Sequence, residues 1–225
     1  MNTYLDGEGG VFMEKSYTKI YTTGATVPLK IRPGHFATNH AHINYYIDVT
    51  TLKARTKEAE DVAQALVGMY LYDTVIDTIV CMEGTEVIGA FLAEELAKGG
   101  FLSTNAHKSI YVISPEFNNN SQIIFRDNLI PMIRDKHVMI LMASVTTGRT
   151  LNKAVECFHY YGGILQGASA IFSAMDSLDG VPIKSVFGKK DLPDYTYSDY
   201  RDCPLCKAGK KIDALVNTFG YSPMG

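Results

Sequence analysis

Apolar residues recur along three segments of the chain with the spacing of an amphipathic helix. Residues 55–71 (RTKEAEDVAQALVGMYL) place Val62, Leu66 and Met69 on one face and charged residues on the other. Residues 86–98 and 149–161 show similar spacing, and each is followed by a pair of glycines that is expected to stop the helix. The pattern therefore predicts three helices.

Between these segments lie short, continuous apolar runs rich in β-branched residues. Such runs predict buried strands at residues 74–82, 109–113, 137–143 and 164–174. Strands that alternate with helices predict βαβ units, so we expect an α/β fold with a central parallel sheet flanked by helices. Residues 1–50 and about 180–225 fall outside the alternation. We expect a single domain, 1–225, in which these two end segments form a small hood.

Ligands of parallel sheets bind beyond the carboxyl ends of the strands. Three polar segments follow predicted strands and therefore lie at that edge: residues 83–88, 115–127 and 144–150. The hood is expected to cover the same edge, so the sequence places a site between the hood and the sheet.

Composition narrows the class of protein. The 225 residues suffice for one sizeable core, and the net charge of −3 gives no electrostatic case for nucleic acid or an anionic membrane as the main partner. No apolar run approaches the roughly 20 residues that span a bilayer. The first residues lack the basic-then-apolar order of a signal peptide. We expect a cytoplasmic protein.

The turn 144–150 (SVTTGRT) joins a predicted strand to a predicted helix. Backbone N–H groups at a helix amino terminus lack partners within the helix and attract anions. Hydroxyls, a flexible glycine and a cation surround them, so the turn predicts a phosphate site made by Ser144, Thr146, Thr147, Gly148, Arg149 and Thr150. A plain helix cap without a ligand is the alternative interpretation.

Cysteines and histidines raise the question of a metal. Cys203 and Cys206 form a single C-x-x-C pair, whereas a structural zinc site needs four ligands. We favour a tight turn with packed thiols, and a zinc ion shared across a dimer is the alternative. His35, His40 and His42 form a second cluster, for which surface histidines are favoured over a three-histidine metal site. No metal ligands are assigned.

The strand, turn and helix around residues 138–150 (VMILMASVTTGRT) resemble the phosphoribosyl-diphosphate (PRPP) signature of the type I phosphoribosyltransferases. The wider chain resembles the orotate branch of that family. Residues 34–48 (GHFATNHAHINYYID) are similar to its substrate segment, residues 83–92 lie where its diphosphate loop lies, and residues 203–209 (CPLCKAG) match a motif of longer members. The resemblance covers residues 30–210 and implies a central parallel sheet, a hood and a homodimer.

The resemblance also implies an activity, transfer of phosphoribosyl from PRPP to a pyrimidine-like base, and roles for particular residues. It implies a diphosphate loop, with possible Mg²⁺ ligands, at Glu83, Gly84, Thr85 and Glu86. It implies base-pocket residues at His40, Tyr45 and Tyr46, and a flexible loop that includes Asn120, Gln122 and Arg126. It assigns no catalytic residue.

The chain departs from the family pattern at charged positions. Met142 and Ala143 stand where the resemblance implies two acids that bind the ribose hydroxyls, at a cost of about 3–6 kcal/mol for two charged hydrogen bonds. Residues 114–128 contain no cation before Arg126, and Glu83 and Glu86 replace a lysine of the diphosphate loop. Three hypotheses follow: an orotate-type enzyme, a reduced relative that binds a phosphate or nucleotide ligand, and a structural partner of an active relative.

Overall fold

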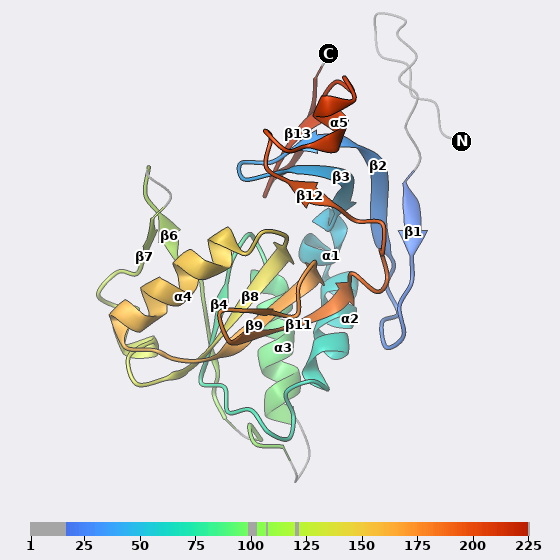
Figure 1. Ribbon diagram of the computed structural model, residues 1–225. Coiled ribbons are helices and arrows are strands. Elements are labelled where there is room, and N and C mark those ends of the chain that lie inside the picture. The colour runs from blue at the N-terminus through green and yellow to red at the C-terminus, as the bar shows by residue number, and fades with distance from the viewer. Residues whose placement is uncertain (1–16, 99–102, 107, 120–121, 225) are drawn as a thin grey trace, which may run out of the picture.

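The computed structural model describes residues 17–98, 103–106, 108–119 and 122–224. These residues form a larger sheet flanked by helices and a smaller sheet above one end of it (Figure 1). We call the smaller sheet, with the short turns that join its neighbouring strands, the hood. Within the described ranges, no helix has the length and apolar character needed to cross a membrane.

The larger sheet is parallel except at one edge. Its order is β10-β11-β9-β8-β4-β5, and β10 alone is antiparallel to its neighbour. In that order the strands are β10 (Ser177–Leu178), β11 (Val181–Gly188), β9 (Ile164–Ser173), β8 (His137–Val145), β4 (Thr78–Cys81) and β5 (Tyr111–Ile113). The predicted α/β fold with a central parallel sheet is confirmed.

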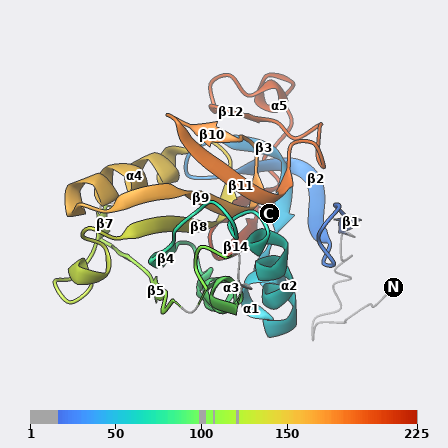
Figure 2. The same ribbon diagram turned by 90° about the horizontal axis from the view of Figure 1, so that it is seen from below.

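Helices cover both faces of this sheet (Figure 2). Helices α2 (Thr56–Val67) and α3 (Glu86–Lys98) lie on one face, and α4 (Arg149–Tyr161) lies on the other. Alternate residues of β8 point to opposite faces. Met139 and Leu141 therefore pack in the cluster with α2 and α3, whereas Val138, Ile140 and Met142 pack against α4.

The predicted helix 55–71 is shorter in the structure, because the chain leaves the helix at Gly68. The turn that follows buries Tyr70, whose hydroxyl bonds to the side chain of Ser169 in β9. Tertiary packing thus ends the helix before its apolar pattern does. The other two predicted helices have the expected bounds, and Gly99 and Gly100, which were expected to stop α3, lie outside the described residues.

The hood combines strands from the two ends of the described chain. Its order is β12-β3-β2-β13-β14, with β1 paired to β2. The strands are β1 (Thr18–Ile20), β2 (Leu29–Ala37), β3 (His42–Asp48), β12 (Tyr197–Ser198), β13 (Ala214–Asn217) and β14 (Gly220–Pro223). Leu29, Phe36 and Tyr46 join the same core cluster as α2 and α3, so the hood packs directly on the helical layer.

One strand within the range expected for the hood lies elsewhere. Residues 181–188 form β11, which pairs in parallel with β9 in the larger sheet. The remaining short elements are α1 (Thr50–Ala54), β6 (Glu116–Phe117), β7 (Ile123–Ile124), the 3-10 helix η1 (Ile130–Met132) and α5 (Pro204–Lys207).

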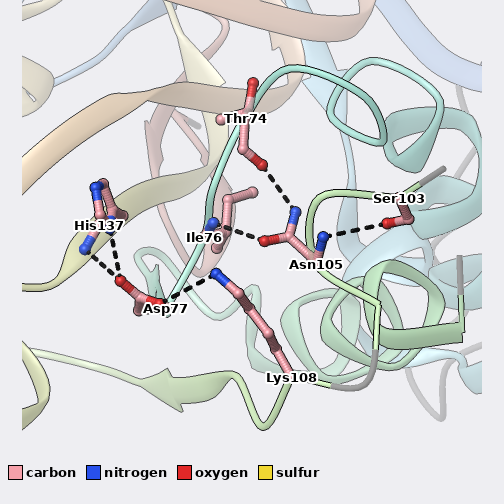
Figure 3. Close-up of polar contacts among 7 residues, drawn as sticks. All are labelled: Thr74, Ile76, Asp77, Ser103, Asn105, Lys108 and His137. Carbon is pink, nitrogen blue, oxygen red and sulfur yellow. Dashed lines mark hydrogen bonds and ion pairs between the residues drawn. The ribbon is translucent and has the colours of Figure 1, made fainter. Parts of the chain in front are cut away.

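The predicted strand 74–82 begins later, at Thr78, because the preceding residues bond to a side chain. The Asn105 amide oxygen accepts the N–H of Ile76 (2.8 Å), and its nitrogen donates to the carbonyl of Thr74 (2.8 Å). Beside this contact, Asp77 accepts hydrogen bonds from the backbone and the ring of His137 (Figure 3). This polar network holds the amino ends of β4 and β8, at the edge of the sheet opposite the carboxyl ends of these strands.

Candidate functional site

A cavity of about 230 Å³ lies between the carboxyl end of β8 and the hood. The turn 144–150 forms one wall. The hood contributes residues 38–40 and the turn between β13 and β14, and α1 closes another side. All six residues predicted to bind phosphate line this cavity: Ser144, Thr146, Thr147, Gly148, Arg149 and Thr150.

The turn 144–150 presents a helix amino terminus to the cavity. Gly148 caps α4 with a left-handed backbone (φ 73°), and the helix begins at Arg149. The first N–H groups of a helix have no carbonyl partner within it, and the helix dipole adds partial positive charge there. Together with the hydroxyls of Thr146, Thr147 and Thr150, these groups form a site suited to a phosphate.

A residue without a predicted role supports this turn. Tyr195, from the segment between β11 and β12, is buried, and its hydroxyl lies 3.0 Å from that of Thr146. Burial raises the pKa of Tyr195 to about 12, so the phenol stays neutral. The contact fixes one wall of the anion site to the C-terminal part of the chain.

Glu83 places a carboxylate on the cavity floor. It follows β4 with a left-handed backbone (φ 60°) and lines the cavity beside the end of β8. Its Oε2 accepts the backbone N–H groups of Ala143 (3.2 Å) and Ser144 (3.4 Å). Burial raises the pKa of Glu83, against these two hydrogen bonds and the nearby charge of Lys53. A partly desolvated carboxylate thus faces the ligand space.

Lys53 of α1 is the second charged group at the floor. Its Nζ donates to the backbone carbonyls of Glu83 (2.6 Å) and Thr218 (3.2 Å). Burial lowers the pKa of Lys53, whereas the charge of Glu83 opposes that change. No motif marks Lys53 in the sequence, because its role depends on two turns distant along the chain.

The base-pocket candidates divide between the cavity and the core. His40 and Tyr46 line the cavity, whereas Tyr45 packs partly buried against the core outside it. Burial and the positive charges of Arg149 and Lys153 lower the pKa of His40, so its ring is neutral at pH 7. His40 therefore brings a neutral imidazole from the hood close to the phosphate turn.

Comparison with solved structures identifies the fold. The structure of UMP synthase from Leishmania donovani matches this chain with a TM-score of 0.53 and 19% sequence identity. The match covers 72% of this chain and 34% of that chain, so this protein spans about a third of the length of that synthase. This chain has the fold of the type I phosphoribosyltransferases.

Two orotate phosphoribosyltransferases have similar folds. The Aeropyrum pernix protein matches with a TM-score of 0.49 at 18% identity, over 73% of this chain and 90% of that chain. The Mycobacterium tuberculosis protein matches with a TM-score of 0.49 at 14% identity, over 73% of this chain and 92% of that chain. No protein-family model matches the chain, and neither does any curated sequence.

In this phosphoribosyltransferase fold, the two positions at which the resemblance implies acids line the cavity, but their side chains carry no acidic group. The side chain of Met142 packs in the core beneath α4 and is 1% exposed. Ala143 is buried beside Glu83, to which its N–H donates. The carboxylate at this end of β8 therefore comes from the loop after β4 rather than from β8 itself.

Of the four diphosphate-loop candidates, only Glu83 lines the cavity. Thr85 is buried, and its hydroxyl donates to the carbonyls of Met82 (2.9 Å) and Leu141 (3.0 Å). Glu86 accepts a hydrogen bond from Ser114. Gly84 is exposed and has a left-handed backbone (φ 81°) that shapes the turn. Thr85 and Gly84 thus hold the loop that presents Glu83.

The two flexible-loop candidates that the structure describes, Gln122 and Arg126, lie away from the cavity. Gln122 accepts a hydrogen bond from Asn118 (2.7 Å) at the β6–β7 hairpin. Arg126 donates a hydrogen bond to Glu116 (2.9 Å), so the positive charge of Arg126 is paired with that carboxylate. Asn120 lies outside the described residues. The hairpin packs beside α4, so neither described candidate contacts the cavity in this arrangement.

Proposed function

We propose that the cavity binds a 5-phosphoribosyl compound and that the protein is a phosphoribosyltransferase, with PRPP as donor and a pyrimidine-like base as acceptor. One observation carries the proposal: the amino terminus of α4 and the whole turn 144–150 line a single cavity beneath the hood. The 5′-phosphate would accept hydrogen bonds from the backbone N–H groups of this turn and from the hydroxyls of Thr147 and Thr150. Arg149 would add a positive charge.

Glu83 supplies the group that binds the ribose in this proposal. Its carboxylate is held at the end of β8, where two acids are implied and neither is present. Both backbone hydrogen bonds to it go to Oε2, and in this proposal Oε1 accepts the hydrogen bond from a ribose hydroxyl. A charged hydrogen bond to a ribose hydroxyl contributes about 1.5–3 kcal/mol, which recovers about half of what two acids would give.

The proposed reaction exchanges one bond at the anomeric carbon. A ring nitrogen of the base forms a bond to C1 of the ribose and gives up its proton to solvent, and the C1–oxygen bond to the diphosphate breaks with its electron pair leaving on the diphosphate. Positive charge develops on the sugar during this exchange, and the nearby Glu83 carboxylate would stabilise it. In this proposal the neutral ring of His40, which lines the cavity, would hydrogen-bond the base.

Mg²⁺ fits the donor set on the floor. It prefers carboxylate and phosphate oxygens, and Glu83 offers a carboxylate beside the space for a diphosphate. When bound, Mg²⁺ would neutralise the repulsion between that carboxylate and the diphosphate. Lys53 lies at the same floor and holds the backbone of Glu83 in place.

The β6–β7 hairpin favours a second candidate function, nucleotide binding without turnover. Arg126 is paired with Glu116 there, so the hairpin brings no unpaired arginine to a diphosphate in this arrangement. A mononucleotide carries one phosphate and needs only the turn 144–150. Under this alternative the protein binds a nucleotide without turnover.

The test combines binding and turnover with one set of ligands. PRPP, orotate, orotidine monophosphate and uridine monophosphate are titrated by calorimetry with Mg²⁺ and with EDTA, and orotate consumption is followed with PRPP present. Turnover with Mg²⁺-dependent PRPP binding supports the enzyme. Nucleotide binding that ignores Mg²⁺, without turnover, supports the second function. If neither PRPP nor either nucleotide binds, both are rejected.

A further inference from the structure

Four metal-binding side chains meet in the hood, away from the phosphate turn. His35 lies in β2 and His42 in β3, whereas Cys203 directly precedes the short helix α5 and Cys206 lies within it. One ligand atom from each residue lies within 4.8 Å of all the others. The two pairs are more than 160 residues apart in sequence, and the packing of α5 on the hood sheet brings them together (Figure 1).

The distances between these atoms fit a tetrahedron around one ion. His35 Nε2 lies 3.1 Å from His42 Nδ1, 3.5 Å from Cys203 Sγ and 3.6 Å from Cys206 Sγ. Cys206 Sγ lies 3.3 Å from His42 Nδ1. Zinc bonds of about 2.05 Å to nitrogen and about 2.3 Å to sulfur place two nitrogens about 3.3 Å apart and a nitrogen and a sulfur about 3.5 Å apart. All four distances lie within about 0.3 Å of these values.

The backbone of β2 aims His35 at this point. The register of β2 against β3 shifts between Pro33 and Phe36, as in a β-bulge, and both His35 and Phe36 are buried. A Cβ at Gly34 would lie 2.5 Å from the Phe36 ring, so the bulge depends on a glycine there. The N–H of His35 donates to Asp213 (2.7 Å), which fixes the strand to the C-terminal segment.

A second set of contacts orients the ligands. His35 Nδ1 lies 2.8 Å from the carbonyl oxygen of Lys210, so the ring donates from that nitrogen and leaves Nε2 as a lone-pair donor. Metal-bound histidines have this arrangement, in which the second ring nitrogen donates to a carbonyl or carboxylate. The backbone of Cys203 is held in turn, because its carbonyl accepts the N–H of Lys207 (3.0 Å).

We propose that His35, His42, Cys203 and Cys206 bind one zinc ion as a structural site within a single chain. Two sulfur and two nitrogen ligands in a tetrahedron are typical of zinc, and four protein ligands leave no open position for catalysis. This assignment replaces the packed-thiol turn favoured from the sequence, and it needs neither a dimer nor His40. His40 lies on the hairpin between the two histidines but lines the cavity instead.

The zinc would connect the site's hood wall to the C-terminal segment. Residues 38–40 between the histidine ligands and residues 216–218 beyond the cysteines all line the cavity. A metal bound only by the folded chain stabilises it, because the unfolded chain has no preformed site. We therefore expect the ion to hold this wall without contacting a ligand in the cavity.

The full chain, purified without a histidine tag, tests the proposal. Elemental analysis of the desalted protein is expected to find one zinc per chain, and a strong chelator is expected to lower the melting temperature. In the presence of the chelator, the Cys206→Ser and His42→Asn variants should each retain at most about a tenth of the zinc that the wild type retains. Cys157→Ser and His159→Asn lie on α4, outside the cluster, and should keep one zinc.

Cobalt gives a readout that does not depend on any variant folding. Co²⁺ added to the metal-free wild-type chain should give the visible bands of tetrahedral Co²⁺ and a near-ultraviolet thiolate charge-transfer band. A weak octahedral spectrum without the charge-transfer band would overturn the site. So would a wild-type chain that holds no zinc and gains no heat stability from it, or a Cys203–Cys206 disulfide in the purified protein.

Discussion

Glu83 Oε2 lies 3.2 Å from the backbone nitrogen of Ala143. Ala143 stands at a position where the resemblance to phosphoribosyltransferases implies an acid. The carboxylate that β8 lacks is thus supplied by the loop after the neighbouring strand β4. Burial raises the pKa of this carboxyl, so the ionised form of Glu83 costs the fold stability. A group kept in place at such a cost is a candidate for function rather than for folding.

The substitution Glu83→Gln separates a role of this carboxylate in ligand binding from a role in folding stability. The raised pKa means that the folded chain binds the proton more tightly than the unfolded chain does, so stability falls as pH rises through that window. We expect Glu83→Gln to unfold at the same or a higher temperature than the wild type at pH 7. Its affinity for PRPP should fall at least about tenfold, because one charged hydrogen bond is lost.

Thermal unfolding at several pH values and calorimetry with PRPP measure both effects. Glu86→Gln is the matched control, because Glu86 begins α3 directly after the loop that holds Glu83 but lies outside the cavity. A Glu83→Gln variant that binds PRPP as well as the wild type would remove Glu83 from the ribose site.

Arg149→Ala tests the positive charge at the phosphate turn. Arg149 is exposed at the first position of α4 and lines the cavity. Solvent screens an exposed cation, so we expect about a tenfold loss of affinity for a phosphate ligand and little change in stability. Arg134→Ala, an exposed arginine before β8 at the opposite edge of the sheet, should leave calorimetric binding unchanged. Equal effects of the two substitutions would argue against a local anion site.

Gly148→Ala tests the backbone of the same turn. Gly148 has φ 73°, and a Cβ there would lie 3.0 Å from the side chain of Leu178. The left-handed backbone costs about 1 kcal/mol for alanine, and the contact adds about 1 kcal/mol more. Gly180→Ala has a similar backbone (φ 83°) but open space around the added methyl, so it should cost about half as much in chemical denaturation. The reverse order would contradict the packing described for this turn.

Asp77→Asn tests the network at the opposite edge of the sheet. Burial opposes ionisation of Asp77, but hydrogen bonds from the backbone and ring of His137 outweigh it and lower the pKa of the carboxyl. Its stabilisation is therefore present above its unfolded pKa of about 4 and lost as pH falls through the lower folded value. We expect Asp77→Asn to cost about 1–2 kcal/mol at pH 7 and to show a smaller loss of stability on acidification. Asp135→Asn, at an exposed site, serves as the control in the same pH series of denaturant melts.

The fold was predictable where periodicity reflects burial. β8 is buried on both faces and reads as a continuous apolar run, and α3 and α4 keep their predicted bounds. The hood was harder to predict, because its strands are paired across the length of the chain: β13 lies parallel to β2. Local pattern also cannot show that Asn105 takes the backbone bonds of Thr74 and Ile76, which delays β4.

The site was predictable to the extent that it is local. The turn 144–150 is continuous in sequence, and every residue assigned to it lines the cavity. Lys53 and Tyr195 act through contacts with residues far along the chain, to Glu83 and Thr146, so neither has a motif. The four residues of the proposed zinc site have separate, weak signals, because the two pairs meet only when α5 packs on the hood.

A crystal structure of the protein with PRPP and Mg²⁺ tests the central claim most directly. We predict that the 5′-phosphate lies against the backbone N–H groups of residues 147–150, with the ribose hydroxyls within hydrogen-bond distance of Glu83. Density for PRPP with its phosphate outside this turn, or a turn without any bound anion at saturating PRPP, would contradict the account.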